Sequence, residues 1–279
     1  MDIKRALIYG DASLQNTSPS TRIDAEMLLL FVLKNTRTHL YTHPEALLTP
    51  EQWQHYQHLI SQRSLGHPIA HLTQSKEFWS LPLRVTHDTL IPRPETELLV
   101  ELTLMLLGTT DNAHILDLGT GSGAIALALA SERPTWQIKA YDQSDAALQV
   151  ARQNALNLKL TQIEFGLSNW FQSIPLKPYH AIISNPPYIA EHDSHLEKGD
   201  VRFEPRQALS SGKEGLNALT EIIKTGIHFL RPGGLLLVEH GYDQKYAVAA
   251  LFAQYGYMGI QSFKDFEGND RITGGFALD

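Results

Sequence analysis

The sequence of 279 residues contains no cysteine. Without thiols the chain can form neither disulfides nor thiolate zinc sites, and it has no thiol nucleophile. The absence is typical of proteins that work in a reducing compartment.

Long apolar runs are also missing. Purely apolar stretches, such as residues 27–33, are far too short to cross a bilayer. The first ten residues carry charges early and contain no signal-peptide hydrophobic region. We therefore expect a soluble, cytoplasmic protein with no membrane partner.

An excess of basic residues is lacking as well, since the formal net charge is −7. Residues 1–75 hold six basic and six acidic residues, whereas the remainder holds 17 basic and 24 acidic ones. Proteins that bind duplex DNA usually carry a basic footprint. The acidic remainder therefore predicts no direct nucleic-acid partner.

The composition that is present, 43% hydrophobic and 19% charged, is ordinary for a globular protein. The length suggests two domains, or one large domain with an appendage. From the patterns below we expect a helical domain at 1–75, a β-hairpin linker at 76–92 and a larger domain at 93–279.

Residues 1–75 are predicted to be helical. Ser20 or Thr21 can cap a helix over 24–33, with Asp24 and Glu26 in its first turn. A second helix is predicted from Pro50, with apolar residues at 53, 56, 59 and 60 on one face. These patterns predict a small helical bundle that could dock a protein partner.

The linker region changes character. Residues 77–85 are aromatic and β-branched with one proline, which suggests a short hairpin. In the following segment two prolines bracket Arg93, and Pro94 can open a helix that runs to about residue 106.

From residue 113 onward strands and helices alternate. The predicted strands are 113–118, 137–141, 162–165, 181–184, 235–239, 257–263 and 271–277. The predicted helices are 122–132, 144–157, 215–230 and 244–255. Such alternation predicts an α/β fold with a mostly parallel, seven-stranded sheet flanked by helices.

A glycine loop, Asp117-Leu118-Gly119-Thr120-Gly121-Ser122-Gly123, follows the first of these strands. Glycines let the backbone turn tightly and approach a ligand closely. Asp142 ends the next strand, where a carboxylate can accept both hydrogen bonds of a ribose diol. The spacing also satisfies the dinucleotide fingerprint, but Asp117 would repel pyrophosphate and favours the cationic S-adenosylmethionine.

Trp170 follows the third predicted strand of the sheet. An aromatic ring at this place could cover an adenine ring. An isolated tryptophan also commonly belongs to a hydrophobic core, so both interpretations stay open.

The apolar residues 181–184 lead directly into Asn185-Pro186-Pro187-Tyr188. The Asn185 side-chain oxygen and the Pro186 carbonyl can grip both hydrogens of a planar nitrogen, while Tyr188 can stack on its plane. A primary amide is a poor nucleophile, so orientation is what its methylation needs. The Asn-Pro-x-Tyr pattern also occurs in turns that bind adaptor proteins. Here a buried strand leads directly into the tetrapeptide, which predicts that it lies at the edge of a sheet.

His192 and His195 flank Asp193 in the loop that follows. Without cysteine, and without a helix to fix their spacing, they are interpreted as solvated loop residues. We expect no metal.

The chain resembles the HemK-type protein-(glutamine-N5) methyltransferases that modify peptide chain release factors. The matching segments are residues 91–97, 117–126, 185–189 and 203–205. The similarity spans nearly the whole chain. It implies a class I, Rossmann-like methyltransferase fold with a small N-terminal helical, substrate-docking domain.

The resemblance also implies the site. The cofactor-binding residues it indicates are Asp117, Gly119, Thr120, Gly121, Ser122, Gly123, Asp142, Trp170 and Asn185. Asn185, Pro186, Pro187 and Tyr188 would hold the glutamine of the release factor's Gly-Gly-Gln motif, with Asn185, Pro186 and Tyr188 catalytic. The implied cofactor is S-adenosyl-L-methionine, which leaves S-adenosyl-L-homocysteine as the product.

Two positions depart from the family pattern. Asn169 and Glu214 stand where aspartate is frequent, which makes adenine-side contacts less defined. Two other substrates share this chemistry: a glutamine of a large-subunit ribosomal protein and, in another class, the N6 amine of adenine in DNA. The acidic larger part argues against DNA.

Overall fold

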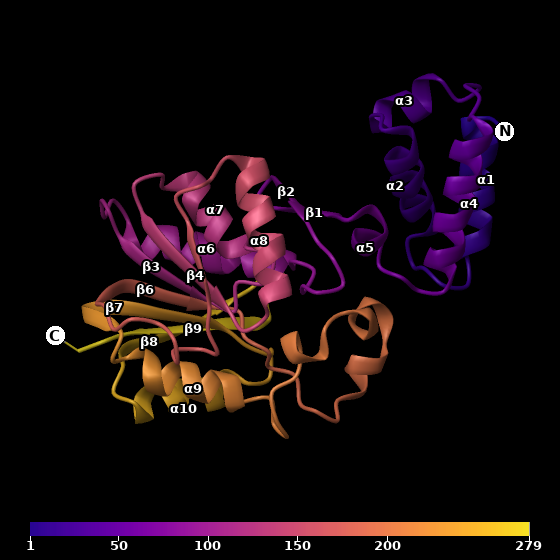
Figure 1. The fold of residues 1–279 in the computed structure, drawn as a ribbon. Helices are drawn as coiled ribbons and strands as arrows, with labels where there is room; N and C mark the ends of the chain where they lie inside the picture. Colours follow the sequence, from indigo (N-terminus) through magenta and orange to yellow (C-terminus); the bar gives the residue numbers. More distant parts are fainter. Residues whose placement is uncertain (279) are drawn as a thin grey trace. The chain divides into compact units, whose positions relative to one another are not determined.

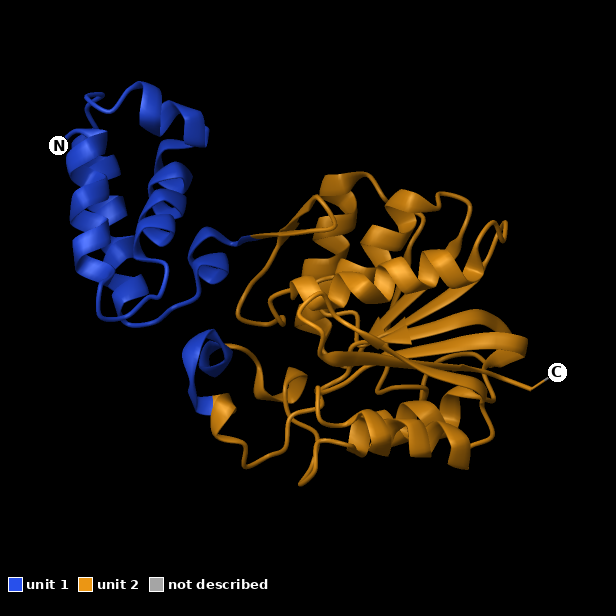
Figure 2. Cartoon of the chain, turned by 180° about the vertical axis from the view of Figure 1, so that it is seen from behind, with its two compact units in different colours: residues 1–75, 197–203 blue, residues 76–196, 204–279 orange. Residues whose placement is uncertain are grey.

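The computed structural model describes residues 1–278, and its fold is drawn in Figure 1. The chain separates into two compact units (Figure 2). Residues 1–75 and 197–203 form the first unit, and residues 76–196 with those from 204 onward form the second. The domain boundaries expected from the sequence stay a prediction. No pattern in the sequence indicated that residues 197–203 group with the first unit.

The first unit is helical. Its helices are α1 (Ile3–Leu14), α2 (Thr21–Leu33), α3 (Arg37–Thr42), α4 (Pro50–Ser64) and α5 (Ile69–Thr73). Leu7 of α1, Leu28 and Leu29 of α2 and Ile60 of α4 are fully buried in one core. The sequence analysis did not predict α1, although its buried residues at positions 3, 6, 7, 10 and 14 follow helical spacing.

Helix α4 begins as the sequence predicted. Pro50 is its first residue, and the preceding Thr49 forms a capping box with Gln52: each side chain bonds the other's backbone N–H. Helix α2 follows Ser20, whose side chain makes no capping hydrogen bond. The proline, threonine and glutamine together fix where α4 starts.

Residues 197–203 are fastened to the end of α4. The buried Arg63 donates to Asp24 Oδ2 at 2.7 Å and to Asp200 Oδ1 at 3.1 Å. Arg202 donates to the Leu65 carbonyl at 2.8 Å. These bonds attach a loop segment that lies more than 130 residues later in the chain.

A β-hairpin lies at the start of the second unit. Strands β1 (Ser75–Phe78) and β2 (Leu81–Arg84) pair, which confirms the predicted hairpin. Trp79 and Ser80 between them both have positive φ, +52° and +58°. Two such residues form the type of tight turn that matches strand twist.

The main sheet contains seven strands in the order β5-β4-β3-β6-β7-β9-β8 among the described residues. They are β3 (His114–Leu118), β4 (Gln137–Asp142), β5 (Glu164–Leu167), β6 (Tyr179–Ser184), β7 (Leu230–Glu239), β8 (Met258–Lys264) and β9 (Asp270–Phe276). Among the described residues, β9 alone runs in the direction opposite to the other six strands of this sheet. The predicted mostly parallel, seven-stranded α/β fold is confirmed.

Helices cover both faces of this sheet (Figure 1). One face carries α6 (Glu97–Leu107), α7 (Ala124–Glu132) and α8 (Asp145–Leu158), and the other carries α9 (Asn217–Gly226) and α10 (Lys245–Gln254). Alternate strand residues serve the two cores, as Ile115 and Leu116 do. No helix of residues 1–278 is long and apolar enough to span a membrane.

Several predicted boundaries shift. Pro94 opens a short 3₁₀ turn, η1 (Pro94–Thr96), and α6 begins only at Glu97. Helix α7 starts at Ala124 because Gly121 and Gly123 adopt positive φ. Strand β7 begins five residues before the predicted 235, and α9 accordingly ends at residue 226 instead of 230.

Candidate active site

The glycine loop joins β3 to α7 at the carboxyl edge of the sheet. The N–H groups of Gly119 and Thr120 donate to the Tyr141 carbonyl of β4, at 2.8 and 3.0 Å. Behind the loop, the Thr120 hydroxyl donates to Asp117 Oδ2 at 2.7 Å. The loop is therefore tied to the ends of both β3 and β4.

Gly123 ends this loop where α7 meets α8. Its φ is +86°, and a Cβ there would lie 3.0 Å from Leu127 and 3.2 Å from Ala151. A side chain would be both strained and crowded, so glycine is required for this close approach.

Asp142, at the end of β4, holds the loop from the other side. Its Oδ2 accepts from the Gly121 N–H and its Oδ1 from the Ser144 N–H, both at 2.9 Å. Burial raises the pKa of Asp142, while the hydrogen bonds from backbone N–H groups oppose that rise. Each carboxylate oxygen has two lone pairs, so the side chain can still accept bonds from a ligand.

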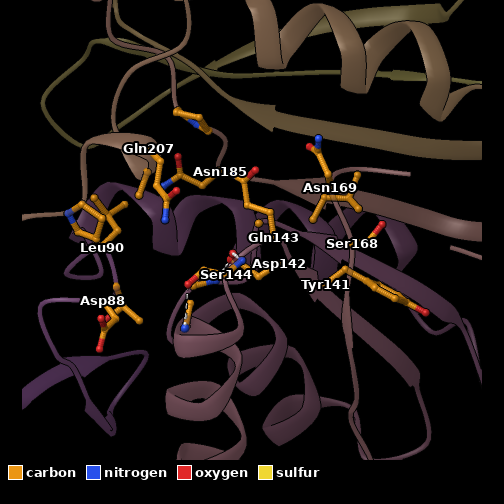
Figure 3. A pocket seen from close by; sticks show the side chains of 18 of the residues that line it. Asp88, Leu90, Tyr141, Asp142, Gln143, Ser144, Ser168, Asn169, Asn185 and Gln207 are labelled. Atoms are coloured by element: carbon orange, nitrogen blue, oxygen red, sulfur yellow. Dashed lines mark hydrogen bonds between the residues drawn. The ribbon is translucent and has the colours of Figure 1, made fainter. Parts of the chain in front are cut away.

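A pocket opens at this edge, with about 690 Å³ of empty space when the open solvent at its mouth is included (Figure 3). Its walls come from the glycine loop, the ends of β4 and β6, and residues 88–90 and 205–208. Figure 3 shows Asp142, Asn185 and Gln207 among the side chains around it.

Trp170 belongs to both the pocket and the core. Its half-buried ring packs against the core cluster that contains Leu118 and Tyr141, and it also lines the pocket. A Cβ on Gly119 would lie 3.6 Å from the ring carbon Cζ3, which places the indole beside the glycine loop. The ring thus belongs to the core, as one of the two interpretations expected, and its contact with adenine stays a prediction.

Asn185 follows β6 and is tied to a buried pair. Its Nδ2 donates to Thr96 Oγ1 at 3.0 Å, and that hydroxyl donates to Glu239 Oε2 at 2.7 Å. Thr96 and Glu239 are only 4% and 1% exposed. Within residues 1–278, no group donates to Asn185 Oδ1 or to the Pro186 carbonyl, so both acceptors stay available.

Tyr188 is held at both ends. Its hydroxyl donates to Glu239 Oε1 at 3.1 Å, and its carbonyl accepts from Gln244 Nε2 at 2.9 Å. Gly215, with φ of +73°, passes so close that a Cβ would lie 2.1 Å from the Tyr188 carbonyl oxygen. The tetrapeptide is therefore fixed from behind by Glu239 of β7, by Gln244 and by the close approach of Gly215.

The proline-bracketed segment meets the loop after the tetrapeptide. Arg93 donates to Glu204 Oε1, and the Ile91 N–H donates to Glu204 Oε2 at 2.9 Å. The Glu204 side chain is fully buried. This pair fixes residues 205–208 beside the pocket, which the sequence analysis did not foresee.

Burial dominates the electrostatics of the site. It raises the pKa of Asp117 and of Glu239 to about 7 in each case, against the hydrogen bonds those carboxylates accept. It also raises the pKa of Tyr188, so its hydroxyl stays protonated and donates to Glu239.

The structure brings half of the predicted site residues to the pocket wall. The predicted residues that line it are Gly119, Gly121, Asp142, Trp170, Asn185 and Pro187. Those that lie outside its lining are Asp117, Thr120, Ser122, Gly123, Pro186 and Tyr188. The second group supports the loop and the tetrapeptide from behind.

Some lining residues were missed by the sequence analysis. Because Gln143 and Ser144 directly follow Asp142 at the end of a strand, their position in the pocket could have been predicted from the sequence. Asp88 and Gln207 carried no such signal, because their position depends on how distant loops fold together. Among residues 1–278, no group of three or more histidines and acids is placed to hold a metal.

Comparisons with known proteins agree over the whole chain. The Methyltransferase small domain family matches residues 95–202, and the PrmC N-terminal domain family matches residues 5–73. A release factor glutamine methyltransferase of Shewanella oneidensis is 47% identical over 273 residues, which cover 98% of this chain and 95% of that protein. One of Buchnera aphidicola subsp. Acyrthosiphon pisum is 46% identical over the full length of both.

The fold has structural relatives as well. A methyltransferase structure from Pyrococcus furiosus aligns with a TM-score of 0.55 at 17% identity, covering 80% of this chain and 98% of that one. That likeness concerns the fold alone. The full-length identity to the two sequence relatives carries the assignment: this chain belongs to the release factor glutamine methyltransferase family.

Proposed function

We propose that this chain transfers a methyl group from S-adenosyl-L-methionine to N5 of the glutamine in the Gly-Gly-Gln motif of a peptide chain release factor. The observation that carries the proposal is that Asn185 shares one pocket with Asp142 and the glycine loop. A cofactor held by the loop and an amide held by Asn185 would thus meet. Family membership supports the chemistry and the protein substrate.

The residues of the pocket fit the cofactor. Asp142 has lone pairs left for a ribose diol, and the Trp170 ring offers an apolar face for adenine. From behind the loop, the carboxylate of Asp117 favours a cation. Thr120, Ser122 and Gly123 shape the loop. When bound, the cofactor supplies an electrophilic methyl group on a sulfonium.

The chain's own part in the reaction is orientation. The lone pair of a primary amide nitrogen is delocalised into its carbonyl, so random encounters are unproductive. Asn185 Oδ1 and the Pro186 carbonyl can accept the two N–H bonds and point the nitrogen at the methyl group. Such positioning can supply about 7–11 kcal/mol of the barrier reduction.

Tyr188 and Pro187 complete the proposed acceptor site. Pro187 lines the pocket, and Tyr188 stands beside it with its hydroxyl held by Glu239. We propose that the Tyr188 ring stacks on the plane of the acceptor amide and excludes water. A rigid tyrosine costs little ordering entropy when the substrate arrives.

The experiment uses the full chain with labelled cofactor and a purified release factor. Label should enter the release factor, and mass spectrometry should place one added methyl on the glutamine of Gly-Gly-Gln. A release factor with that glutamine changed to alanine is the control and should take up no label. Labelling of another residue of the release factor, or no labelling of the release factor at all, would refute the proposal.

The same assay separates the alternative substrates. A large-subunit ribosomal protein and a DNA duplex are offered in parallel at equal concentration. The acidic charge of the larger part predicts the weakest transfer to DNA. Faster methylation of the ribosomal protein than of the release factor would reassign the substrate while keeping the chemistry.

A further inference from the structure

Two hydrogen bonds converge on one buried carboxylate beneath the tetrapeptide, and a third connects Asn185 to it through Thr96. Glu239 Oε2 accepts from the Thr96 hydroxyl, and Oε1 accepts from the Tyr188 hydroxyl. The Thr96 oxygen in turn accepts from Asn185 Nδ2. Glu239 does not line the pocket, so any effect on the reaction passes through these neighbours.

The direction of these bonds is fixed by chemistry. Above its pKa of about 7, the Glu239 carboxylate is ionised and can only accept hydrogen bonds, and a threonine hydroxyl has a single hydrogen. Thr96 therefore donates its single hydroxyl hydrogen to Glu239, and its oxygen can act only as an acceptor toward Asn185. The group of Asn185 that faces Thr96 is then the NH₂, and Oδ1 is turned away from it.

This matters because a carboxamide has two orientations that differ by half a turn. With Oδ1 exposed, Asn185 offers an acceptor to an incoming N–H. With NH₂ exposed, it would offer hydrogens to a group that carries hydrogens itself. The same Glu239 also fixes the Tyr188 hydroxyl, so one carboxylate sets the orientation of two tetrapeptide side chains.

A buried carboxylate is expensive to maintain. Removing an ionised group from water costs several kcal/mol unless hydrogen bonds offset the loss. A glutamine or an apolar residue at 239 would fill the same space without that cost. The charge is thus explained by what an acceptor-only group does for its neighbours.

We propose that Glu239, acting through Thr96 and Tyr188, is a positioning residue that holds the Asn185 oxygen toward the acceptor amide. This inference rests on the proposed function, because it assigns Glu239 a role in the same transfer. Thr96 lies 143 residues before Glu239 in the chain, and the fold alone brings them together.

The test variant is Glu239→Gln, which keeps size but adds an NH₂ group. The hydroxyl of Thr96 or Tyr188 that faces this NH₂ loses its hydrogen-bond acceptor. If it is Thr96, its hydroxyl can turn and donate to Asn185 instead, which favours the flipped orientation of the Asn185 amide. At pH 8, where Glu239 is mostly ionised, we expect kcat for release factor methylation to fall about 10- to 100-fold, in the range of misplaced catalytic groups. The dissociation constant of the cofactor, measured by calorimetry, should stay within about threefold.

Two comparisons separate positioning from simple stability. Thr96→Val should lower kcat as Glu239→Gln does, and Thr96→Ser, which keeps the hydroxyl, should restore most of it. The matched control is Thr103→Val, a fully buried threonine on α6 whose hydroxyl bonds only its own helix, and its kcat should not change. In an Asn185→Ala, Tyr188→Phe background, Glu239→Gln should have almost no further effect on kcat.

A second readout needs no substrate. The side-chain NH₂ hydrogens of Asn185 should exchange slowly in the wild type and several-fold faster in Glu239→Gln, as seen by NMR. Unchanged kcat and exchange in Glu239→Gln would overturn the inference, as would an equal loss of kcat in the Asn185→Ala, Tyr188→Phe background. If the wild type fails to methylate the release factor, the proposed function fails, and the exchange rates alone decide the orientation of Asn185.

Discussion

A single carboxylate, Asp142, combines support of the loop with the proposed ribose contact. It accepts the Gly121 and Ser144 N–H groups while facing the pocket. This double use explains why an acid suits the end of β4. An amide could accept only one of those two N–H groups and would present hydrogens to the other.

Asp142→Ala should weaken cofactor binding by about 1.5–3 kcal/mol, because charge-assisted bonds are lost. This corresponds to a dissociation constant raised about 10- to 150-fold, which calorimetry measures. Asp145→Ala, which removes an exposed acid in the first turn of α8, is the control and should bind normally. Unchanged affinity in Asp142→Ala would move the ribose site elsewhere.

Asn185→Ala should leave most of the cofactor affinity and lower turnover at least about 100-fold, because one of the two orienting acceptors is lost. Single-turnover methylation of the release factor measures this step. Asn157→Ala, an exposed asparagine on α8, serves as the control. Wild-type turnover in Asn185→Ala would remove this residue from the mechanism.

The buried acids also predict how stability depends on pH. Asp117 has an ordinary pKa of 3.8 and a folded-state pKa of about 7, so the folded chain binds its proton more tightly than the unfolded chain. Its contribution to stability is full below pH 3.8 and is lost as the pH rises through 7. Glu239 behaves alike between 4.5 and about 7.

We therefore expect the melting temperature of the cofactor-free chain to fall as the pH rises from about 5 to 8. Asp117→Asn cannot ionise and should flatten that slope. Burial alone would raise the pKa of Asp265, but hydrogen bonds from Asn269 and Arg271 lower it below its ordinary value. Asp265 therefore titrates at lower pH and should not affect stability between pH 5 and 8. A melting temperature that rises from pH 5 to 8 in the wild type, or an unchanged slope in Asp117→Asn, would contradict this account.

At the scale of elements, residues 205–208 in the segment after the tetrapeptide form part of the pocket wall. Ile189 bridges to Ser210, which closes residues 189–210 into a loop. The 3₁₀ turns η2 (Ser194–Glu197), η3 (Gly199–Phe203) and η4 (Arg206–Ala208) shape it. Glu204 ties it to residues 91–93.

Glu204→Gln should loosen this segment, because the Arg93 guanidinium loses its charged partner and the bond weakens by about 1–2 kcal/mol. Hydrogen exchange of residues 205–209 should quicken. The KM for the release factor should rise about 5- to 30-fold. Glu191→Gln, an exposed acid in the same loop, should alter neither quantity. Unchanged exchange and KM in Glu204→Gln would exclude a role for this tie in shaping the pocket.

At the scale of the whole molecule, the helices and the loop share a unit despite their distance in sequence. Residues 197–203 belong with residues 1–75, and the Arg63–Asp200 pair is one of the bonds responsible. The pair is half exposed on the Asp200 side, so its contribution is at most about 1 kcal/mol. Arg63 keeps Asp24 as a second partner.

Asp200→Asn should therefore leave the melting temperature almost unchanged while releasing residues 197–203. Limited proteolysis should cut this segment several-fold faster than in the wild type, because local opening depends on the few bonds that hold it. Asp111→Asn, an exposed acid of the second unit, is the control. Equal cutting rates would show that His67, Phe203 and Arg202 suffice to hold the segment.

The sequence by itself determined the features that depend on neighbours along the chain. Apolar strands, the glycine loop and the Asn-Pro-Pro-Tyr turn each follow from short patterns, and so did the start of α4 and the alternation of strands and helices along the chain. The helix α1 was equally readable from its spacing. Boundaries shifted where positive φ or a 3₁₀ turn delayed a helix.

Only the tertiary structure decided which distant side chains meet. Thr96 and Glu239 lie beneath Asn185, Glu204 pairs with Arg93, and residues 197–203 join the helical unit. No local pattern encodes these contacts. They arise because the strand order and register bring the ends of different strands and their loops together. Burial then requires each polar group there to have a hydrogen-bond partner.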